Sequence, residues 1–420
     1  MPGFDPHTVI WIAAALATCC VIFRPFGVPE WVWALSAAAL LTGFGLIPWP
    51  SALAAIAKGT DVYLFLIGMM VLAELARQEG LFDWLAMYAA QHAQGSGQRL
   101  FDLVFLVGTL VTIFLSNDAT AVVLTPAVYA AAKAAKAEPL PYLFVCAFIA
   151  NAASFVLPIS NPANLVIFGS HMPPLLTWLW QFSLPSMAAI GLTYIVLRLT
   201  QRKHLRQTLE TVIALQPLSS GARLTAFGIM LTAAVLLLAS AFDLQLGLPT
   251  FCAGLATAGL IHLRQRMSPM PVLKGVSWGV LPLVGGLFVL VEGLAQTGII
   301  NSLAHTLASL AEHSSSQATW GAGLVVAIAS NVINNLPAGL IAGSVGHIAH
   351  LPTPTTSALL IGVDLGPNLS ITGSLATLLW LIAVRREGEH VSAVDFLRVG
   401  ILVMPPALIG ALAALSLNPG

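Results

Sequence analysis

The sequence predicts an all-α polytopic membrane protein built from two repeats of inverted topology. Three observations support this fold class. Hydrophobic residues make up 58% of the 420 residues and charged residues only 8%, whereas soluble domains carry about 25% charged residues. Blocks of sequence from the first half recur, in the same order, in the second half. The Lys and Arg residues also fall almost entirely on one side of the predicted crossings.

The repeats are visible as four blocks that recur 212 to 220 residues later. The matched blocks are 27–41 with 247–261, 71–85 with 289–303, 114–122 with 330–340, and 159–168 with 371–380. We therefore divide the chain into a first repeat (1–204), a linker (205–222) and a second repeat (223–420). The crossings predicted in the first repeat are 8–23, 30–48, 61–78, 141–168 and 183–200. Because five is an odd number, the second repeat enters the membrane inverted.

Each repeat is also predicted to hold one re-entrant hairpin and one broken helix. The hairpins are 101–134 and 318–349, and the broken helices are 141–170 and 357–384. The arms of the first hairpin, 101–116 and 119–133, are shorter than the ~20 residues that a crossing helix needs. With five crossings in each repeat we expect about ten transmembrane helices in all. Unpaired backbone groups are costly in hydrocarbon, so we expect the breaks to be enclosed by protein near the midplane.

The distribution of Lys and Arg predicts the orientation of the chain. With the N-terminus outside, sixteen of the seventeen Lys and Arg residues lie on the cytoplasmic side and only Lys58 lies outside. This is the positive-inside pattern. We expect a cytoplasmic linker and both termini in the periplasm of a bacterial cell, with the chain in the inner membrane. Two full crossings in place of each hairpin would give the same sidedness.

The predicted breaks collect polar side chains, as in secondary transporters, where discontinuous helices bind substrate near the midplane. The candidate substrate ligands are Asn117, Ser160, Asn161, Asn164, Asn334, Asn335, Thr372 and Ser374. The breaks also contain two carboxylates, Asp118 and Asp364, and ionisable groups inside a membrane are functional by default. The alternative for any single residue in this set is that it holds helices together.

Other chemistry-bearing residues are given structural roles. Glu74 and Glu292 occupy matched positions near helix ends, where we expect interfacial or hydrogen-bonded carboxylates. His347 and His350 are expected at the membrane interface. The four cysteines lie in apolar runs without a CxxC pair, so no metal site, disulfide or cofactor is predicted. The 17 basic and 17 acidic residues cancel, and no surface for nucleic acid is indicated.

The second break resembles a signature of a known family. The stretch "LIGVDLGPNLSITGSLATLLWL" (360–381) is similar to the C-terminal signature of arsenite and antimonite efflux permeases of the ArsB type, the arsenical pump membrane proteins of the ion transporter superfamily. "SNDATAVVLTP" (116–126) and "NNLPAGLIAG" (334–343) resemble two further segments of that family. The resemblance covers essentially the whole chain. It implies a scaffold of helices and a transport domain with hairpins that moves against it.

The polar set suits the substrate that this resemblance implies. Trivalent arsenic and antimony are neutral trihydroxides in water, so their site needs hydrogen bonds and no counter-ion. Amides and hydroxyls both donate and accept. A proton that enters as the hydroxide leaves could drive export, and burial favours the protonated form of a carboxyl group. Asp118, at a hairpin tip, is the preferred proton carrier, and Asp364 is then expected to orient its break by accepting backbone N–H bonds.

Several alternatives stay open. A sodium/proton antiporter of the same fold would place Asp118 and Asp364 around a hard cation, which prefers oxygen ligands. A silicic acid carrier would bind another neutral hydroxide, and a passive channel would show no proton dependence. A dicarboxylate carrier is disfavoured because no Lys or Arg lies in a break. An enzyme is not expected, and without a GxxxxGK[ST] loop the chain is not expected to hydrolyse ATP. The resemblance leaves open a soluble arsenite-stimulated ATPase as a partner.

The predicted sidedness can be tested by labelling the linker. In a variant without the four native cysteines, we expect Ser219→Cys to react with a membrane-impermeant maleimide in everted vesicles. It should not react in intact cells, because the reagent cannot reach the cytoplasm. Labelling from the periplasm of intact cells would contradict the topology.

Overall fold

The computed structural model describes residues 5–169, 172–211, 217–266 and 268–417 and is helical over most of their length. The α-helices of the first half are α1 (Pro6–Phe23), α2 (Glu30–Gly43), α3 (Trp49–Lys58), α4 (Thr60–Gln78), α5 (Leu81–His92), α6 (Gly97–Phe114), α7 (Asn117–Ala119), α8 (Thr125–Ala134), α9 (Leu140–Ala152), α10 (Pro162–Phe168) and α11 (Leu175–Gln201). Those of the second half are α12 (Ser220–Ala241), α13 (Gly247–Gln265), α14 (Met270–Gly275), α15 (Val280–Gln296), α16 (Ile299–His313), α17 (Ser315–Ile333), α18 (Asn335–Ile348), α19 (Thr353–Leu365), α20 (Leu375–Arg386) and α21 (Ala393–Ser416). Short helical turns complete the path at η1 (Pro25–Gly27), η2 (Thr120–Leu124), η3 (Pro158–Ser160), η5 (His204–Arg206) and η6 (Gly366–Leu369).

The all-helical membrane fold that the sequence predicts is confirmed. Among the described residues, six helices are long and apolar enough to cross a membrane, and two bent pairs raise the number to eight. The bent pairs are α3 with α4 (46°) and α15 with α16 (73°). The expected number of about ten crossings stays a prediction. α6 and α17, which lie in the predicted hairpins 101–134 and 318–349, are 18 and 19 residues long and are both among the six. Their length therefore does not by itself make them re-entrant.

The helices of the two halves follow one another in the same order, and their packing is reciprocal. α4 packs against α13, and α15, which corresponds to α4, packs against α2, which corresponds to α13. Glycines permit both close crossings: Gly254 of α13 faces Gly68 of α4, and Gly286 of α15 faces Ala34 of α2. This pattern is what two repeats related by a two-fold axis would produce. The inverted orientation of the repeats stays a prediction.

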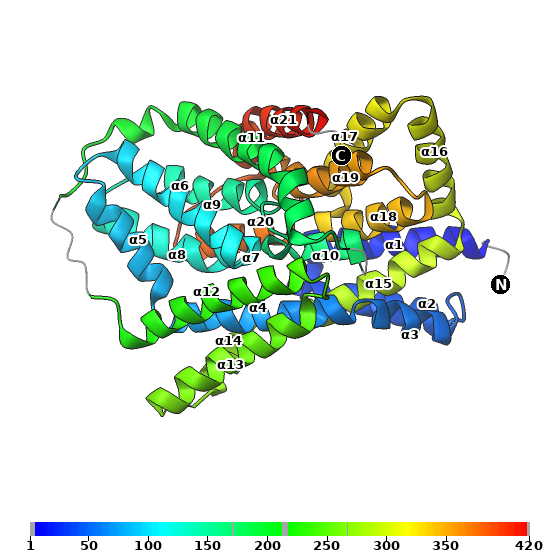
Figure 1. The fold of residues 1–420 in the computed structure, drawn as a ribbon, viewed down its shortest axis with the longest axis horizontal. Helices are drawn as coiled ribbons and strands as arrows, with labels where there is room; N and C mark the ends of the chain where they lie inside the picture. The colour runs from blue at the N-terminus through cyan, green and yellow to red at the C-terminus, as the bar shows by residue number, and fades with distance from the viewer. Residues whose placement is uncertain (1–4, 170–171, 212–216, 267, 418–420) are drawn as a thin grey trace.

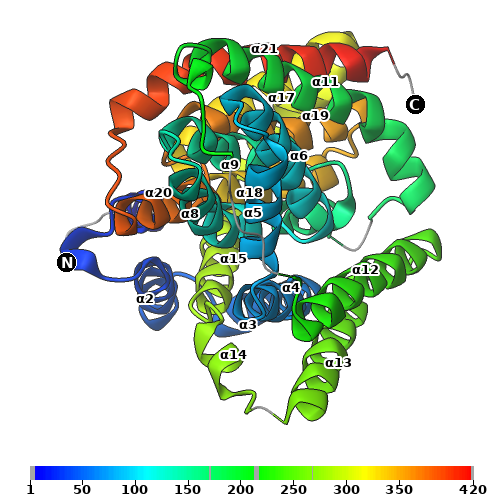
Figure 2. The ribbon, with the colours of Figure 1, turned by 90° about the vertical axis from the view of Figure 1, so that its left-hand side faces the viewer.

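The helices form two parts in both ribbon views. α2, α3, α4, α12 and α13 lie together on the lower side of Figures 1 and 2, and the bundle above them contains α6, α9, α17 and α19. α11 and α21 lie side by side over the top of that bundle and pack against each other. The start of α1 and the segments that flank the linker lie at opposite ends of the long axis in Figure 1. The predicted sidedness requires such a separation.

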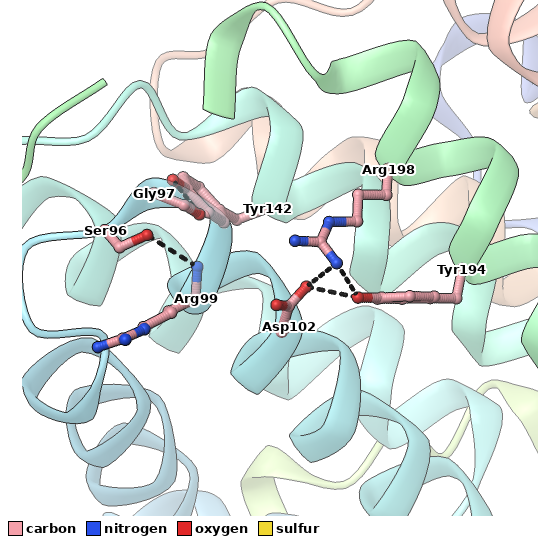
Figure 3. A network of polar contacts seen from close by, with 7 residues as sticks. All are labelled: Ser96, Gly97, Arg99, Asp102, Tyr142, Tyr194 and Arg198. Carbon is pink, nitrogen blue, oxygen red and sulfur yellow. Dashed lines mark hydrogen bonds and ion pairs between the residues drawn. The ribbon is translucent and has the colours of Figure 1, made fainter. Parts of the chain in front are cut away.

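Polar contacts attach the linker, and also the end of α11, to other helices of the first half. The Leu209 N–H donates to the Gly95 carbonyl (2.9 Å) and the Glu210 N–H to the Ala135 carbonyl (2.9 Å). Lys136 pairs with Glu210 at 2.7 Å, and this hydrogen bond raises the pKa of Lys136. Figure 3 shows a second network, which joins α6 to α11. In this network Tyr194 donates to Asp102 (2.8 Å), and Arg198 donates to Tyr194 and pairs with Asp102.

The glycine contact between α4 and α13 leads to a stability prediction. A Cβ at Gly254 would lie 2.7 Å from the Gly68 carbonyl oxygen, whereas nothing lies within 4 Å of a Cβ at Gly259 on the same helix. We expect Gly254→Ala to destabilise the protein by about 1–3 kcal/mol through overpacking. The matched control Gly259→Ala should be neutral or stabilising by up to about 1 kcal/mol, from helix propensity. Thermal unfolding in detergent measures both, and equal melting temperatures for the two variants would contradict this packing.

Candidate functional site

Four breaks interrupt the helices of the upper bundle, and a polar side chain caps the helix that follows each break. Backbone N–H groups at a helix start have no partner within the helix, and a capping oxygen satisfies them. The caps are Ser116 (to the Ala119 N–H), Asn161 (Ala163), Asn334 (Leu336) and Ser374 (Thr377). Asn334 has φ +72° and ψ 153°, a backbone conformation that is found almost only at glycine and is therefore strained. Three of the four predicted breaks are therefore capped by a predicted site residue, and the fourth is capped by Ser116.

The break after α9 meets the last turn of α19 in a fully buried contact. Asn161 Nδ2 donates to Asp364 Oδ1 at 2.6 Å, while Asn161 Oδ1 caps α10 by accepting from the Ala163 N–H. The other carboxylate oxygen, Asp364 Oδ2, is buried and has no hydrogen-bond partner. Nearby on α10, Asn164 donates to the carbonyls of Ser154, Leu157 and Pro158. The structure therefore brings three predicted site residues together, and Asp364 accepts from a side chain rather than from the backbone of its own break.

The break after α19 meets the last turn of α9 in a similar way. Ser374 Oγ donates to Asn151 Oδ1 at 3.4 Å, and Asn151 Nδ2 donates to Asn368 Oδ1 (3.0 Å) and Thr377 Oγ1 (3.3 Å). Asn368 in turn donates to the Phe148 carbonyl at 3.0 Å. All four polar residues are at most 1% exposed. This cluster places the predicted residue Ser374 among three residues outside the predicted site.

The junction between α17 and α18 is tied to the same break. Asn331 Nδ2 donates to the carbonyls of Ala327 and Gly366, both at 2.8 Å, and Asn331 Oδ1 accepts from Ser370 at 2.7 Å. Thr372 donates to the Asn331 carbonyl at 3.1 Å. Asn334 donates to the Thr372 carbonyl at 3.2 Å, and the Asn335 N–H to the Gly373 carbonyl at 2.8 Å. Asn334, Asn335 and Thr372 are therefore neighbours, as a common site requires.

The junction between α6 and α7 is less connected. Asn117 Oδ1 accepts from the Asp118 N–H at 2.9 Å, and Ser160 donates to the Ile113 carbonyl at 3.0 Å. The turn η2 that follows has a π-helical hydrogen-bond pattern, which is frequent at functional sites. Asp118 is half-buried, and no hydrogen bond or ion pair of its carboxylate is found among the described residues. The structure shows no direct contact between Asp118 and Asp364.

Several residues of the buried cluster escaped the sequence prediction. Asn151 lies inside an apolar run of α9 and carried no break signal, although it occupies the position in the first half that Asp364 occupies in the second. Asn331 and Asn368 lie a few residues from predicted ligands. Asn331 lies one helical turn before Asn335, so in a continuous helix the two would share a face. This spacing was a signal that could have identified Asn331.

The remaining ionisable residues and cavities lie outside this cluster. Glu74 accepts hydrogen bonds from Arg77 and Gln78, and Glu292 pairs with Lys58 at 3.2 Å, so both glutamates are hydrogen-bonded as the sequence predicts. An apolar cavity of about 430 Å³ lies between α2, α3 and α15, and a polar one of about 320 Å³ adjoins Arg99 and Asp102. The break residues line neither of these two cavities, and Asn151, Asp364, Asn368 and Ser374 are fully buried. No group of three or more metal-ligating side chains occurs among the described residues.

Comparison with known proteins identifies the group to which the chain is related. The family model of citrate transporters (CitMHS) matches residues 11–362. An arsenical pump membrane protein of Escherichia coli is 30% identical over 84% of this chain and 85% of its own length, and one of Yersinia enterocolitica is equally similar. An uncharacterized transporter of Mycobacterium tuberculosis is 26% identical over 85% of both chains.

Two solved structures share the fold. The YdaH transporter of Alcanivorax borkumensis, described as having an unusual topology, aligns with a TM-score of 0.59 at 14% identity, over 92% of this chain and 97% of its own. MtrF of Neisseria gonorrhoeae, described as one of a class of antimetabolite efflux pumps, aligns with a TM-score of 0.52 at 13% identity, over 99% and 95%. At these identities the likeness concerns the fold alone.

The contacts of Asn331 lead to a prediction for the site. Asn331→Ala removes the side-chain bonds that join α17 to the break after α19: the Gly366 carbonyl loses its side-chain donor, and the Ser370 hydroxyl loses one of its two polar partners. We expect a loss of about 1–3 kcal/mol of stability, the usual cost of unpaired buried groups. The adjacent control Ser330→Ala loses only a bond within its own helix, to the Val326 carbonyl. Thermal unfolding should rank Asn331→Ala below Ser330→Ala, and the reverse order would contradict the structural role of Asn331.

Proposed function

We propose that this chain, which belongs to the citrate transporter family of membrane transporters, exports trivalent arsenic and antimony as neutral hydroxides. Export would be secondary active transport across the bacterial inner membrane in exchange for protons. The arsenical pump relatives support the substrate, and the breaks in the membrane helices support the mechanism. The proposed orientation has both termini in the periplasm and the linker in the cytoplasm.

The character of the polar cluster is the observation that carries this proposal. The described residues of the four breaks supply amides, hydroxyls and two carboxylates, and they include no Lys or Arg. Citrate is a multiply charged anion and would leave its carboxylates without a positive partner in such a site, which is costly in a buried environment. A neutral trihydroxide needs only donors and acceptors. The cluster therefore suits an arsenic or antimony hydroxide better than the substrate after which the family is named.

We assign the substrate contacts to the polar residues of the breaks, which would be released from their present partners as the site opens. The proposed ligands are Asn117, Ser160, Asn161, Asn164, Asn334, Asn335, Thr372 and Ser374. The amide of Asn335 and that of Asn117 open the helices that follow the two junctions.

We infer that Asp364 is better placed than Asp118 to carry the proton, which reverses the preference drawn from the sequence. Asp364 is fully buried, and one of its oxygens has no donor. A proton on that oxygen would remove the cost of an isolated buried charge. Asp118 is only half-buried beside the junction of α6 and α7, so its negative charge costs less than that of Asp364 and gives less reason to bind a proton. Coupling to a soluble ATPase partner is a further possibility that the family resemblance implies.

A sodium/proton antiporter is the second candidate, and one observation favours it. Asp364 Oδ2 and Asn164 Oδ1 are both buried acceptors without a donor, and a hard cation prefers oxygen ligands. A silicic acid carrier would use the same amides and hydroxyls as an arsenite carrier. Competition by sodium and by silicic acid therefore belongs in the transport assay.

The experiment is arsenite uptake into everted vesicles with and without an imposed pH gradient, acid inside. We expect the wild-type protein to accumulate arsenite when the gradient is present. Asp364→Asn should still exchange arsenite down its own gradient, because the amide imitates the protonated acid, but it should not respond to pH. Asp118→Asn is the comparison and should keep a pH response. Arsenite pumping that stays normal in both variants would exclude carboxylate coupling at these positions. Exchange of sodium for protons without arsenite transport would favour the antiporter.

A further inference from the structure

The two buried contacts at the breaks are related by one constant spacing. Helix α9 ends at Ala152 and α19 at Leu365, and helix α10 begins at Pro162 and α20 at Leu375. Both pairs of helix ends differ by 213 residues. At the same spacing Asn151 corresponds to Asp364, the cap Asn161 to the cap Ser374, and Asn164 to Thr377. The two halves therefore place a polar residue at each of three equivalent positions.

The contacts made at these positions are reciprocal. The cap of α10 in the first half donates to position 364 in the second half, through Asn161 and Asp364 at 2.6 Å. The cap of α20 in the second half donates to position 151 in the first half, through Ser374 and Asn151 at 3.4 Å. Each half thus supplies one cap and one acceptor, as a two-fold axis through the crossing would require. The acceptor is a carboxylate on one side and an amide on the other.

Asn151 both accepts and donates hydrogen bonds, as a protonated carboxyl group would. Its Oδ1 accepts from Ser374, and its Nδ2 donates to Asn368 Oδ1 at 3.0 Å and Thr377 Oγ1 at 3.3 Å. A protonated aspartate has the same shape, and it could keep the bond from Ser374 and one of the two donor bonds, because it has one O–H in place of two N–H groups. Position 151 is therefore already shaped for the neutral form of the group that occupies position 364.

We propose that Asn151 is the neutral counterpart of Asp364, and that the crossing needs a single carboxylate which either of these two equivalent positions can hold. This inference rests on the proposed proton-coupled transport. It assigns to Asn151 a part in the site that its apolar sequence context hides. A carboxylate moved from 364 to 151 would meet the cap Ser374 as donor in place of the cap Asn161.

The surroundings of both positions are free of other charges. The uncharged side chains beside Asp364 are Asn161, which donates to it, and Ser154, whose hydroxyl donates to the Asn151 carbonyl. No charged residue of the helices packed against α19 acts on it among the described residues. Asn151 faces Ser374, Asn368 and Thr377, which are all uncharged. A proton taken up at the crossing would therefore be held by one carboxylate without a neighbouring ion pair.

The test moves the carboxylate across the axis in the double variant Asn151→Asp/Asp364→Asn. In everted vesicles with an acid interior, Asp364→Asn should exchange arsenite without a response to the pH gradient. The double variant should regain a pH-gradient stimulation that Asp364→Asn lacks. The matched control is Asn368→Asp/Asp364→Asn. Asn368 is as fully buried as Asn151 and touches it, but its equivalent at the same spacing is Phe155, so this control should not regain the response.

The outcomes separate this inference from the function on which it rests. A wild-type protein without any pH response would end the proposed function. A wild-type response that Asp364→Asn abolishes and the double variant fails to regain, although it still exchanges arsenite, would overturn the role of Asn151. Recovery by the Asn368 control would overturn it as well. If the double variant does not accumulate in the membrane, Asn151→Asp alone decides: the pH profile of arsenite exchange should shift, and an unchanged profile contradicts the inference.

Discussion

The need to satisfy backbone groups inside the membrane constrains the whole upper bundle. Each helix break frees N–H and C=O groups that water cannot reach, and an unpaired group in hydrocarbon costs several kcal/mol. Short polar side chains meet this need: Asn161 and Ser374 cap helices, and Asn164 donates to three carbonyls of one break. The same amides and hydroxyls are the groups that a neutral hydroxide would contact. Hydrogen bonding to the free backbone groups and binding of the proposed substrate would thus use the same side-chain atoms. Such a site would be closed when it is empty.

The sequence predicts the composition of the site better than its connections. Low charge, the matched blocks and the polar breaks indicate a helical membrane protein with its site at the breaks, because these features depend on residue type alone. The contacts between halves depend on register. The matched blocks set 371 opposite 159, a spacing of 212, whereas the helix ends and caps give 213. At a spacing of 212 Asp364 corresponds to Ala152, whereas at a spacing of 213 it corresponds to Asn151. Only the positions of the helix ends and caps reveal the correct spacing.

The start of a helix is harder to predict from the sequence than its polar break. The polar pair Asn117-Asp118 suggests a short arm on either side, but α6 continues N-terminally to Gly97, with Ser96 as its cap. The π-helical turn η2 then lets the chain continue into α8 without a second break. An apolar run marks the part of a helix that is buried in hydrocarbon, not the end of the helix. A polar first turn can extend the helix beyond that run. Caps such as Ser96 and Ser314 are the better markers of helix starts.

The proposed proton coupling gives a physical reason for the asymmetry at the crossing. Two carboxylates at equivalent positions of a buried two-fold site would repel each other, and one of them would stay protonated. Two amides would leave the site unable to bind a proton at all. One carboxylate opposite one amide gives a single titrating group in a cluster that is otherwise neutral, with Asn161 as its donor and one oxygen free. A repeat protein that exchanges a neutral solute for a proton therefore benefits from breaking its own symmetry at this position, while the surrounding caps keep it.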